Sequence, residues 1–242
     1  MSFIVFFKYF LLHLIVTLPG TVYYGFVQLY NRLNSINAMH IVYYPQQQHN
    51  LDIIMFVHGR NGHSSNFDPL IKNLEKLGVT HQMISINLGR NGATSVLEDT
   101  LILHNLVKEF ENRNIILVGM SKGGLVVLNY IASYPSNNIS KVITIASPLN
   151  GTMIADYLLP STHISRIEFG WQSLFTQNLK EKLPYNIPIY HIVPDWDHMI
   201  IPNYSAYHVG PNHKRKYYSG LKGHIGIVYA QEVAQYIADW IS

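Results

Sequence analysis

The chain has 242 residues, of which 48% are hydrophobic and 13% charged, and its formal net charge is +3. That length suits one α/β domain and is too short for two of ordinary size, and the low charged fraction suggests contact with a membrane or another interface. The weakly basic balance argues against a dedicated nucleic-acid binder, and the absence of cysteine excludes disulfides, thiol chemistry and cysteine-based metal sites.

Residues 1–36 form a hydrophobic N-terminal segment, and we expect residues 37–242 to form the folded domain. Residues 9–29 contain no Lys, Arg, Asp or Glu, and a stretch of that length can span a bilayer. Four residues weaken the case for a span, namely His13, Pro19, Gly20 and Gln28.

Three structures remain open for this segment: a membrane anchor, a cleaved signal peptide, or a helix packed on the domain. Lys8 lies inside the apolar region and no Ala-x-Ala site follows, which speaks against a signal peptide. We expect membrane association through the segment, with a secreted or periplasmic protein as the alternative.

The rest of the chain alternates between apolar strand-like runs and helical patterns. The expected strands are Ile41–Tyr44, Leu51–Val57, Gln82–Leu88, Ile115–Val118, Lys141–Ala146 and Ile187–Val193. The expected helices are 67–77, a helix opened by the Ser95–Glu98 capping-box pattern, Leu125–Ile131 and Gln231–Trp240. Gln46–Gln48 suggests a linker or hairpin tip, and the basic triplet Lys214–Lys216 a solvated edge strand. This alternation predicts a mostly parallel sheet covered by helices on both faces.

The stretch Gly119-Met-Ser-Lys-Gly123 lies between an expected buried strand and an expected helix. A strand that reverses into a helix within a few residues needs a tight turn, and flanking glycines give the backbone room to make it. The residue at the apex is forced into an unfavourable dihedral region, with its side chain clear of the sheet. Ser121 is therefore the candidate nucleophile.

The Gly-x-Ser-x-Gly turn, the loop His58–Gly62, the order Ser–Asp–His and the segment Gly223–Gly226 resemble the α/β-hydrolase superfamily. The resemblance runs from about Leu51 to the C-terminus and is strongest to small lipases and esterases. It implies an α/β-hydrolase fold with a short or absent lid.

A serine hydroxyl needs a base, and the base a carboxylate that holds its tautomer. The resemblance implies that His224 is the base, because it lies in a glycine-rich loop just before the last helix. Asp195 and Asp197 both follow the strand Ile187–Val193. Asp197 fits the family's spacing to Pro202 better, and Asp195 is kept as a loop cap or supporting partner.

The charge that develops on a substrate carbonyl oxygen needs two N–H donors. One is expected from the amide of Lys122, directly after Ser121 at the start of the helix. By resemblance to the His-Gly loop of lipases, the other comes from the Arg60 amide. The Arg60 side chain is expected in solvent, with recognition of an acidic headgroup as the alternative.

The segment Ser147–Thr152 resembles the Pro-x-x-Gly-Ser/Thr segment of lipases and of deacylases that act on glycosylphosphatidylinositol anchors. Met153–Lys182 would then form a short lid or acyl-site insertion. Its apolar residues are Tyr157, Leu158, Leu159, Phe169, Trp171, Leu174 and Phe175. An ordinary crossover with an apolar core face explains the same residues equally well.

We therefore expect a serine hydrolase of carboxylic esters, acting on a lipid or other acyl ester, with a membrane surface as partner and without nucleic acid, metal or cofactor. A thioesterase, amidase or peptidase passes through the same tetrahedral chemistry and remains open. A catalytically silent interaction protein also remains open, since folds do not fix function.

Overall fold

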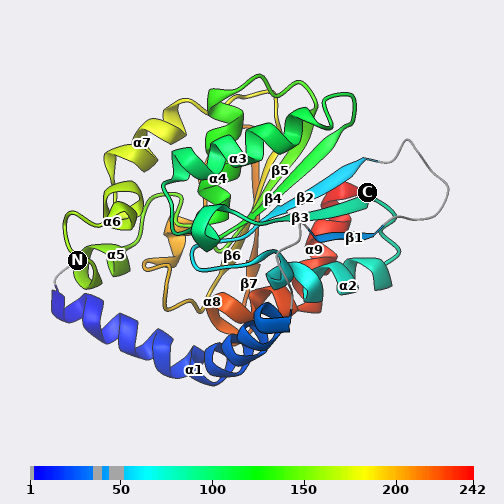
Figure 1. The fold of residues 1–242 in the computed structure, drawn as a ribbon. Coiled ribbons are helices and arrows are strands. Elements are labelled where there is room, and N and C mark those ends of the chain that lie inside the picture. Colours follow the sequence, from blue (N-terminus) through cyan, green and yellow to red (C-terminus); the bar gives the residue numbers. More distant parts are fainter. Residues whose placement is uncertain (1–2, 35–39, 44–51) are drawn as a thin grey trace.

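The computed structural model describes residues 3–34, 40–43 and 52–242, in which a seven-stranded sheet lies between two layers of helices (Figure 1). The strand order is β1-β3-β2-β4-β5-β6-β7. The strands are β1 (His40–Tyr43), β2 (Ile53–Val57), β3 (Gln82–Ile86), β4 (Ile115–Met120), β5 (Ile139–Ile145), β6 (Ile189–Pro194) and β7 (His213–Tyr218). Strand β1 pairs antiparallel with β3, and the other six strands are parallel. The expected mostly parallel sheet is confirmed.

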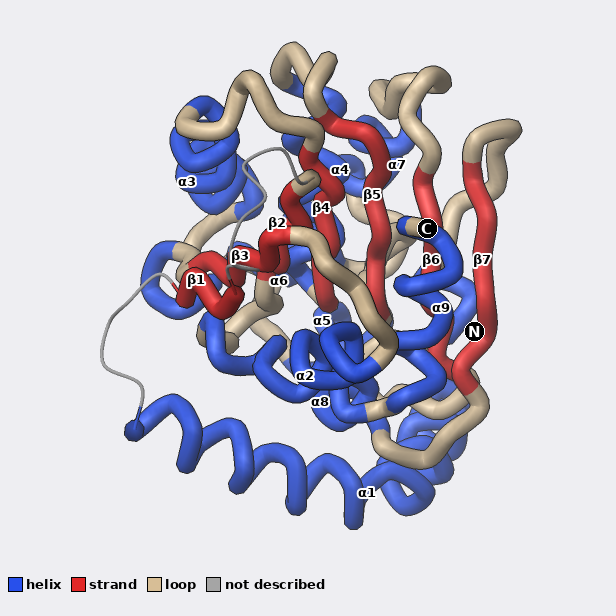
Figure 2. Tube along the Cα trace, turned by 90° about the vertical axis from the view of Figure 1, so that its right-hand side faces the viewer, coloured by secondary structure: helices blue, strands red, loops and turns tan. Residues whose placement is uncertain are grey.

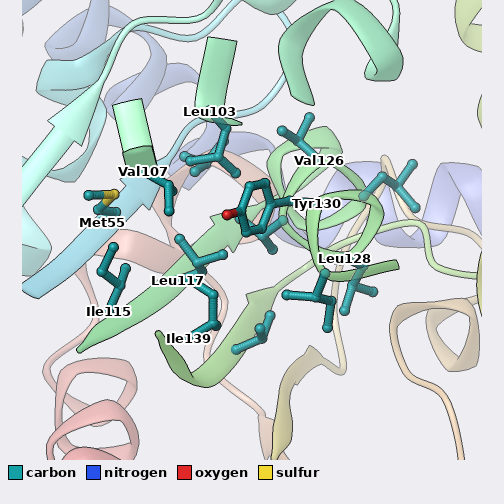
Figure 3. Close-up of a cluster of buried hydrophobic side chains, with 14 of the residues drawn as sticks. Met55, Leu103, Val107, Ile115, Leu117, Val126, Leu128, Tyr130 and Ile139 are labelled. Carbon is teal, nitrogen blue, oxygen red and sulfur yellow. The ribbon is translucent and has the colours of Figure 1, made fainter. Parts of the chain in front are cut away.

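Helices cover both faces of the sheet. Successive side chains of a strand point to opposite faces, so one strand can contribute to two buried clusters. In β2, Ile53, Met55 and Val57 belong to one buried cluster, and Ile54 and Phe56 to another. The first cluster packs against α3 (Val96–Lys108), α4 (Lys122–Ser133) and α7 (Leu174–Glu181). Figure 3 shows part of it, with Tyr130 of α4 among aliphatic side chains. The second packs against α2 (Asp68–Lys76) and α9 (Gln231–Ile241).

Several element boundaries differ from the sequence expectations. Strand β4 continues to Met120, because Gly119 and Met120 pair with Thr144 and Ile145 of β5. Strand β3 ends at Ile86, where its partner β2 ends at Val57. The capping box Ser95–Glu98 is confirmed at the start of α3, and Lys214–Lys216 lies in the edge strand β7, as expected.

The segment between β5 and β6 forms three short helices, α5 (Met153–Leu158), α6 (Ile164–Phe169) and α7. Its apolar side chains differ in environment. Leu179 of α7 is part of the core cluster, with Phe175 packed against it, whereas Leu158 of α5 and Leu174 at the start of α7 are exposed. The smaller elements are η1 (Ser64–Phe67), η2 (Gly89–Gly92), η3 (Asn203–Ala206), α8 (Gly223–Gly226) and η4 (Ile227–Tyr229).

The N-terminal segment forms one helix, α1 (Phe3–Asn34), which continues through Pro19 and Gly20. Figures 1 and 2 show α1 lying across one end of the domain beside α8. Among the helices of the described residues, α1 alone is long and apolar enough to cross a membrane. Its segment Ile4–Val27 has the length and composition that a span requires. In the structure α1 packs against α8, and the same helix has the length and composition of an anchor or a signal sequence. The expected boundary at 36/37 and the linker Gln46–Gln48 lie outside the described residues.

Candidate active site

Ser121 stands at a strained turn between β4 and α4. Its backbone dihedrals are φ 55° and ψ −127°, in a region that non-glycine residues rarely occupy. A Cβ atom at Gly119 would lie 2.4 Å from the carbonyl oxygen of Gly123, and one at Gly123 would lie 2.0 Å from that of Val57. Both glycines are therefore required by close backbone approaches, and they permit the turn that lifts Ser121 off the sheet.

His224 and Asp197 lie in line with this hydroxyl. His224 Nε2 is 2.9 Å from Ser121 Oγ, and His224 Nδ1 is 2.7 Å from Asp197 Oδ2. A proton on Nδ1 would be donated to the carboxylate and would leave Nε2 free to accept the Ser121 proton. The turn after β4 supplies Ser121, the loop after β6 supplies Asp197, and α8 supplies His224. Ser121 and His224, 103 positions apart in the chain, thus meet at the carboxyl ends of the strands.

Asp197 is fully buried and held by backbone donors. Its Oδ1 accepts hydrogen bonds from the N–H groups of Met199 at 2.7 Å and Ile200 at 3.0 Å. Burial opposes ionisation, but His224, the nearby His198 and the Met199 N–H together outweigh it and lower the pKa of Asp197 below its ordinary value. The carboxylate is thus ionised at neutral pH.

Asp195 has a different environment. Its Oδ2 accepts a hydrogen bond from Ser219 Oγ at 2.5 Å, and its backbone N–H donates to Tyr218 at the end of β7. Asp195 therefore ties the β6 loop to β7, while the carboxylate that contacts His224 belongs to Asp197.

Arg60 and Lys122 border the same cavity as Ser121. The Lys122 side chain is buried and ion-paired with Asp99 at 2.5 Å, so its backbone amide is the group available at the start of α4. The Arg60 side chain bonds to Ser165 and, at 3.2 Å, to His163. This side chain, expected in solvent, is half-buried, because α6 begins next to it.

The loop that carries Arg60 is shaped by His58 and Gly59. His58 Nδ1 is 2.7 Å from the Gly59 carbonyl oxygen, and Nε2 accepts the Leu88 N–H at 3.0 Å. A Cβ at Gly59 would lie 2.8 Å from Ser121 Cβ. Glycine is needed at this position because the loop lies directly against the nucleophile.

A cavity of about 510 Å³ opens over Ser121 and His224. Its apolar lining includes Phe10, Leu158, Leu159, Phe169, Met199 and Ile225. Pro148 and Thr152 of the segment Ser147–Thr152 also border it. A larger hollow of about 830 Å³, beside Trp171 and His213, touches none of the three candidate residues, and we place the site in the smaller one.

Two further contacts at the site come from α1, and neither is predicted from the sequence. His13 is buried, with Nδ1 3.0 Å from the backbone nitrogen of Asp197. Thr17 Oγ1 is 2.9 Å from His198 Nδ1, and His198 borders the cavity. Among the described residues, no group of three or more His, Asp or Glu side chains is arranged to hold a metal ion.

Comparison with known proteins agrees with this architecture. Residues 52–186 match the family model described as the alpha/beta hydrolase fold. The structure is similar to lipase B of Aspergillus fumigatus (TM-score 0.71, 15% identity, 84% of this chain and 55% of that one). It is also similar to the mature Bacillus licheniformis lipase BlEst2 (TM-score 0.62, 15% identity, 84% and 96%) and to a thermostable carboxyl esterase of Bacillus coagulans (TM-score 0.56, 18% identity, 82% and 91%).

Among the curated proteins compared, no sequence matches the chain significantly. The chain spans little more than half the length of the Aspergillus lipase. At identities of 15–18% the structural likeness shows the fold alone.

Proposed function

This chain belongs to the α/β-hydrolase family, and we propose that it is a serine hydrolase that cleaves carboxylic esters. The observation that carries the proposal is the line of hydrogen bonds from Asp197 through His224 to Ser121, at 2.7 and 2.9 Å. Ser121 lies at the strained turn and inside the cavity, where a substrate carbonyl can reach its hydroxyl.

The reaction follows from these positions. His224 Nε2 takes the proton of Ser121 as Oγ attacks the ester carbonyl carbon. The carbonyl oxygen becomes negatively charged, and the amides of Lys122 and Arg60 stabilise it. The tetrahedral species then collapses, and His224 returns the proton to the leaving alcohol. In the second half of the reaction, His224 takes a proton from a water molecule, the water attacks the acyl-enzyme, and the carboxylic acid is released.

An apolar acyl group suits the cavity better than a polar one. Its walls carry Phe10, Leu158, Leu159 and Phe169, and burial of each methylene of an acyl chain contributes roughly 0.8 kcal/mol. The esterase and lipase neighbours support ester substrates in general. We propose a lipid or other acyl ester as substrate, with α1 as the means of membrane association.

The test is hydrolysis of p-nitrophenyl esters of increasing acyl length by the wild type and by Ser121→Ala. The alanine variant should lose turnover by several orders of magnitude and keep its melting temperature. Ser219→Ala is the matched control, because its hydroxyl binds Asp195. Wild-type turnover by Ser121→Ala would refute the mechanism.

Thioesters and amides pass through the same intermediate, so the same enzyme preparation should be assayed on an acyl thioester and an acyl anilide. A higher kcat/KM for the thioester or the anilide than for the matched ester would change the assigned class. A folded wild type that hydrolyses none of the three would favour a silent binding protein.

A further inference from the structure

One face of helix α1 is docked on the loops that carry the candidate site. The docked residues follow one another at intervals of three and four positions, the spacing of one helix face. They are Phe6, Phe10, His13, Thr17, Gly20 and Tyr24. Phe6 is buried with Met153, Ile154 and Ile201, and Tyr24 stacks near Tyr229 with ring centroids 4.3 Å apart.

Polar contacts hold this face in place. His13 contacts the backbone of Asp197, Thr17 contacts His198, and the Lys222 ammonium donates to the Tyr24 hydroxyl at 2.5 Å. If α1 left the domain to cross a bilayer, His13 and Thr17 would lose these partners and enter hydrocarbon, which is costly for polar groups. The contacts therefore favour a helix that stays on the domain.

The opposite face of α1 is apolar and exposed. The exposed large apolar side chains are Ile4, Val5, Phe7, Tyr9, Leu11, Leu12, Ile15, Leu18, Val22, Tyr23, Phe26 and Leu29, and Lys8 is exposed among them. No charged residue interrupts residues 9–29. Isolated apolar residues are common on protein surfaces, but a continuous face of this length marks an interaction site.

Apolar side chains from the docked face of α1 lie at the mouth of the cavity. Phe6 contacts Tyr157 of α5 with ring centroids 4.3 Å apart, and the exposed Leu158 and Met199 border the opening together with Phe10 of α1. The exposed face of α1 carries no charged residue from residue 9 to residue 29, and the exposed Lys8 lies at its amino end, where its long side chain can reach lipid headgroups. An apolar helix face beside an acyl-sized cavity matches the hydrocarbon of a lipid leaflet.

We propose that α1 lies in the plane of a bilayer surface, with its outer face in one leaflet and its inner face on the Asp197 and His224 loops. The cavity then opens toward the bilayer, and an ester can enter it from the lipid without crossing water. The supply of substrate from the bilayer rests on the proposed ester hydrolysis, whereas the orientation of α1 does not.

Depth measurements with nitroxide labels test the orientation. The chain has no native cysteine, so Ile4→Cys, Ile15→Cys and Phe26→Cys each give a single labelled site. These positions are eleven residues apart, or about three helical turns, and share one face. The variants are made in the Ser121→Ala background, labelled with a nitroxide and bound to phosphatidylcholine–phosphatidylglycerol vesicles. The depth of each label is then measured by power saturation in the presence of oxygen, which concentrates in the bilayer, and of a nickel chelate, which stays in water.

An in-plane helix predicts the same shallow depth for all three labels. The control Asn137→Cys, exposed at the amino end of β5, should stay aqueous. A spanning helix would place the Ile15 label near the bilayer centre and the other two near opposite surfaces, which would overturn the proposal. Aqueous labels in the presence of vesicles, or spin–spin broadening between two copies of the chain, would also overturn it. Since Ser121→Ala is inactive by design, the result does not depend on whether the chain hydrolyses esters.

Discussion

The backbone nitrogen of Asp197 lies 3.0 Å from Nδ1 of His13, a residue 184 positions earlier in the chain. The His13 ring also packs near Tyr9 and Trp196, with centroids 4.4 and 5.2 Å away. The N-terminal helix therefore contacts the loop that carries the proposed catalytic acid. A substitution on the docked face of α1 should therefore change the rate of the reaction at Ser121.

Replacing His13 with Ala removes a ring nitrogen that lies 3.0 Å from both the backbone nitrogen and the carbonyl oxygen of Asp197, and it leaves a gap between two aromatic rings. We expect kcat on a soluble p-nitrophenyl ester to fall by about ten- to a hundred-fold with little change in KM, because small displacements of catalytic groups are costly. His13→Asn, which keeps an acceptor, should restore part of the loss. Ile15→Ala, on the exposed face, is the control; wild-type kcat in His13→Ala would contradict a positioning role.

Two glycines of α1 offer a second matched pair. A Cβ at Gly20 would lie 2.9 Å from the Lys222 carbonyl oxygen, next to the His224 loop, whereas one at Gly25 would meet nothing within 4 Å. Gly20→Ala should lower both the melting temperature and kcat. Gly25→Ala should keep kcat and stabilise the helix by up to about 1 kcal/mol. Equal behaviour of the two variants would show that α1 is not docked as described.

The two loop carboxylates can be separated by amide substitutions. Asp197→Asn should lower kcat by about 10⁴-fold, because the amide no longer selects the productive tautomer of His224. Asp195→Asn should stay within a few-fold of wild type, since Asp195 binds Ser219. Steady-state kinetics of both variants decides the assignment, and a larger loss in Asp195→Asn would reverse it.

Glu168 gives the protein a pH-dependent stability. One of its carboxyl oxygens accepts the Val96 N–H at 2.7 Å, and the other is buried without a partner in the described structure. Burial raises the pKa of Glu168 to about 7. In the unfolded chain the Glu168 carboxyl has its ordinary pKa of 4.5 and loses its proton above that pH, whereas the folded protein keeps the proton up to about pH 7. The free energy of unfolding therefore falls as the pH rises from 4.5 to about 7.

Glu168→Gln lacks this proton and should lose that part of the pH dependence. The melting temperature of Glu168→Gln minus that of the wild type should therefore be larger at about pH 8 than at about pH 5. Thermal melts at both pH values measure the difference. A difference between the two proteins that stays constant with pH would contradict the raised pKa.

The fold class and the turn at Ser121 could be predicted because their signals are local. Glycines 119 and 123 border a serine between a β-branched run and a helix, and the structure has that strand, turn and helix. The acid was harder, since Asp195 and Asp197 share one loop and only its backbone course decides which carboxylate faces His224. The catalytic roles of Ser121, His224, Asp197, Arg60 and Lys122 stay predictions.

The place of α1 could not be predicted from hydrophobicity, which does not say what covers each face of a helix. By composition, His13 and Gly20 weaken the case for a membrane span. In the structure, His13 meets a backbone amide and Gly20 lets the helix approach the Lys222 carbonyl. Their three- and four-residue spacing with Phe6, Phe10 and Thr17 was the available signal.

The central claim is that His224 makes the Ser121 hydroxyl nucleophilic, and reaction with a fluorophosphonate probe followed by peptide mass spectrometry tests it most directly. We predict one adduct, on Ser121, that forms rapidly in the wild type and is lost or greatly slowed in His224→Ala. A folded wild type whose Ser121 stays unmodified, or a His224→Ala variant labelled at the wild-type rate, would contradict the claim.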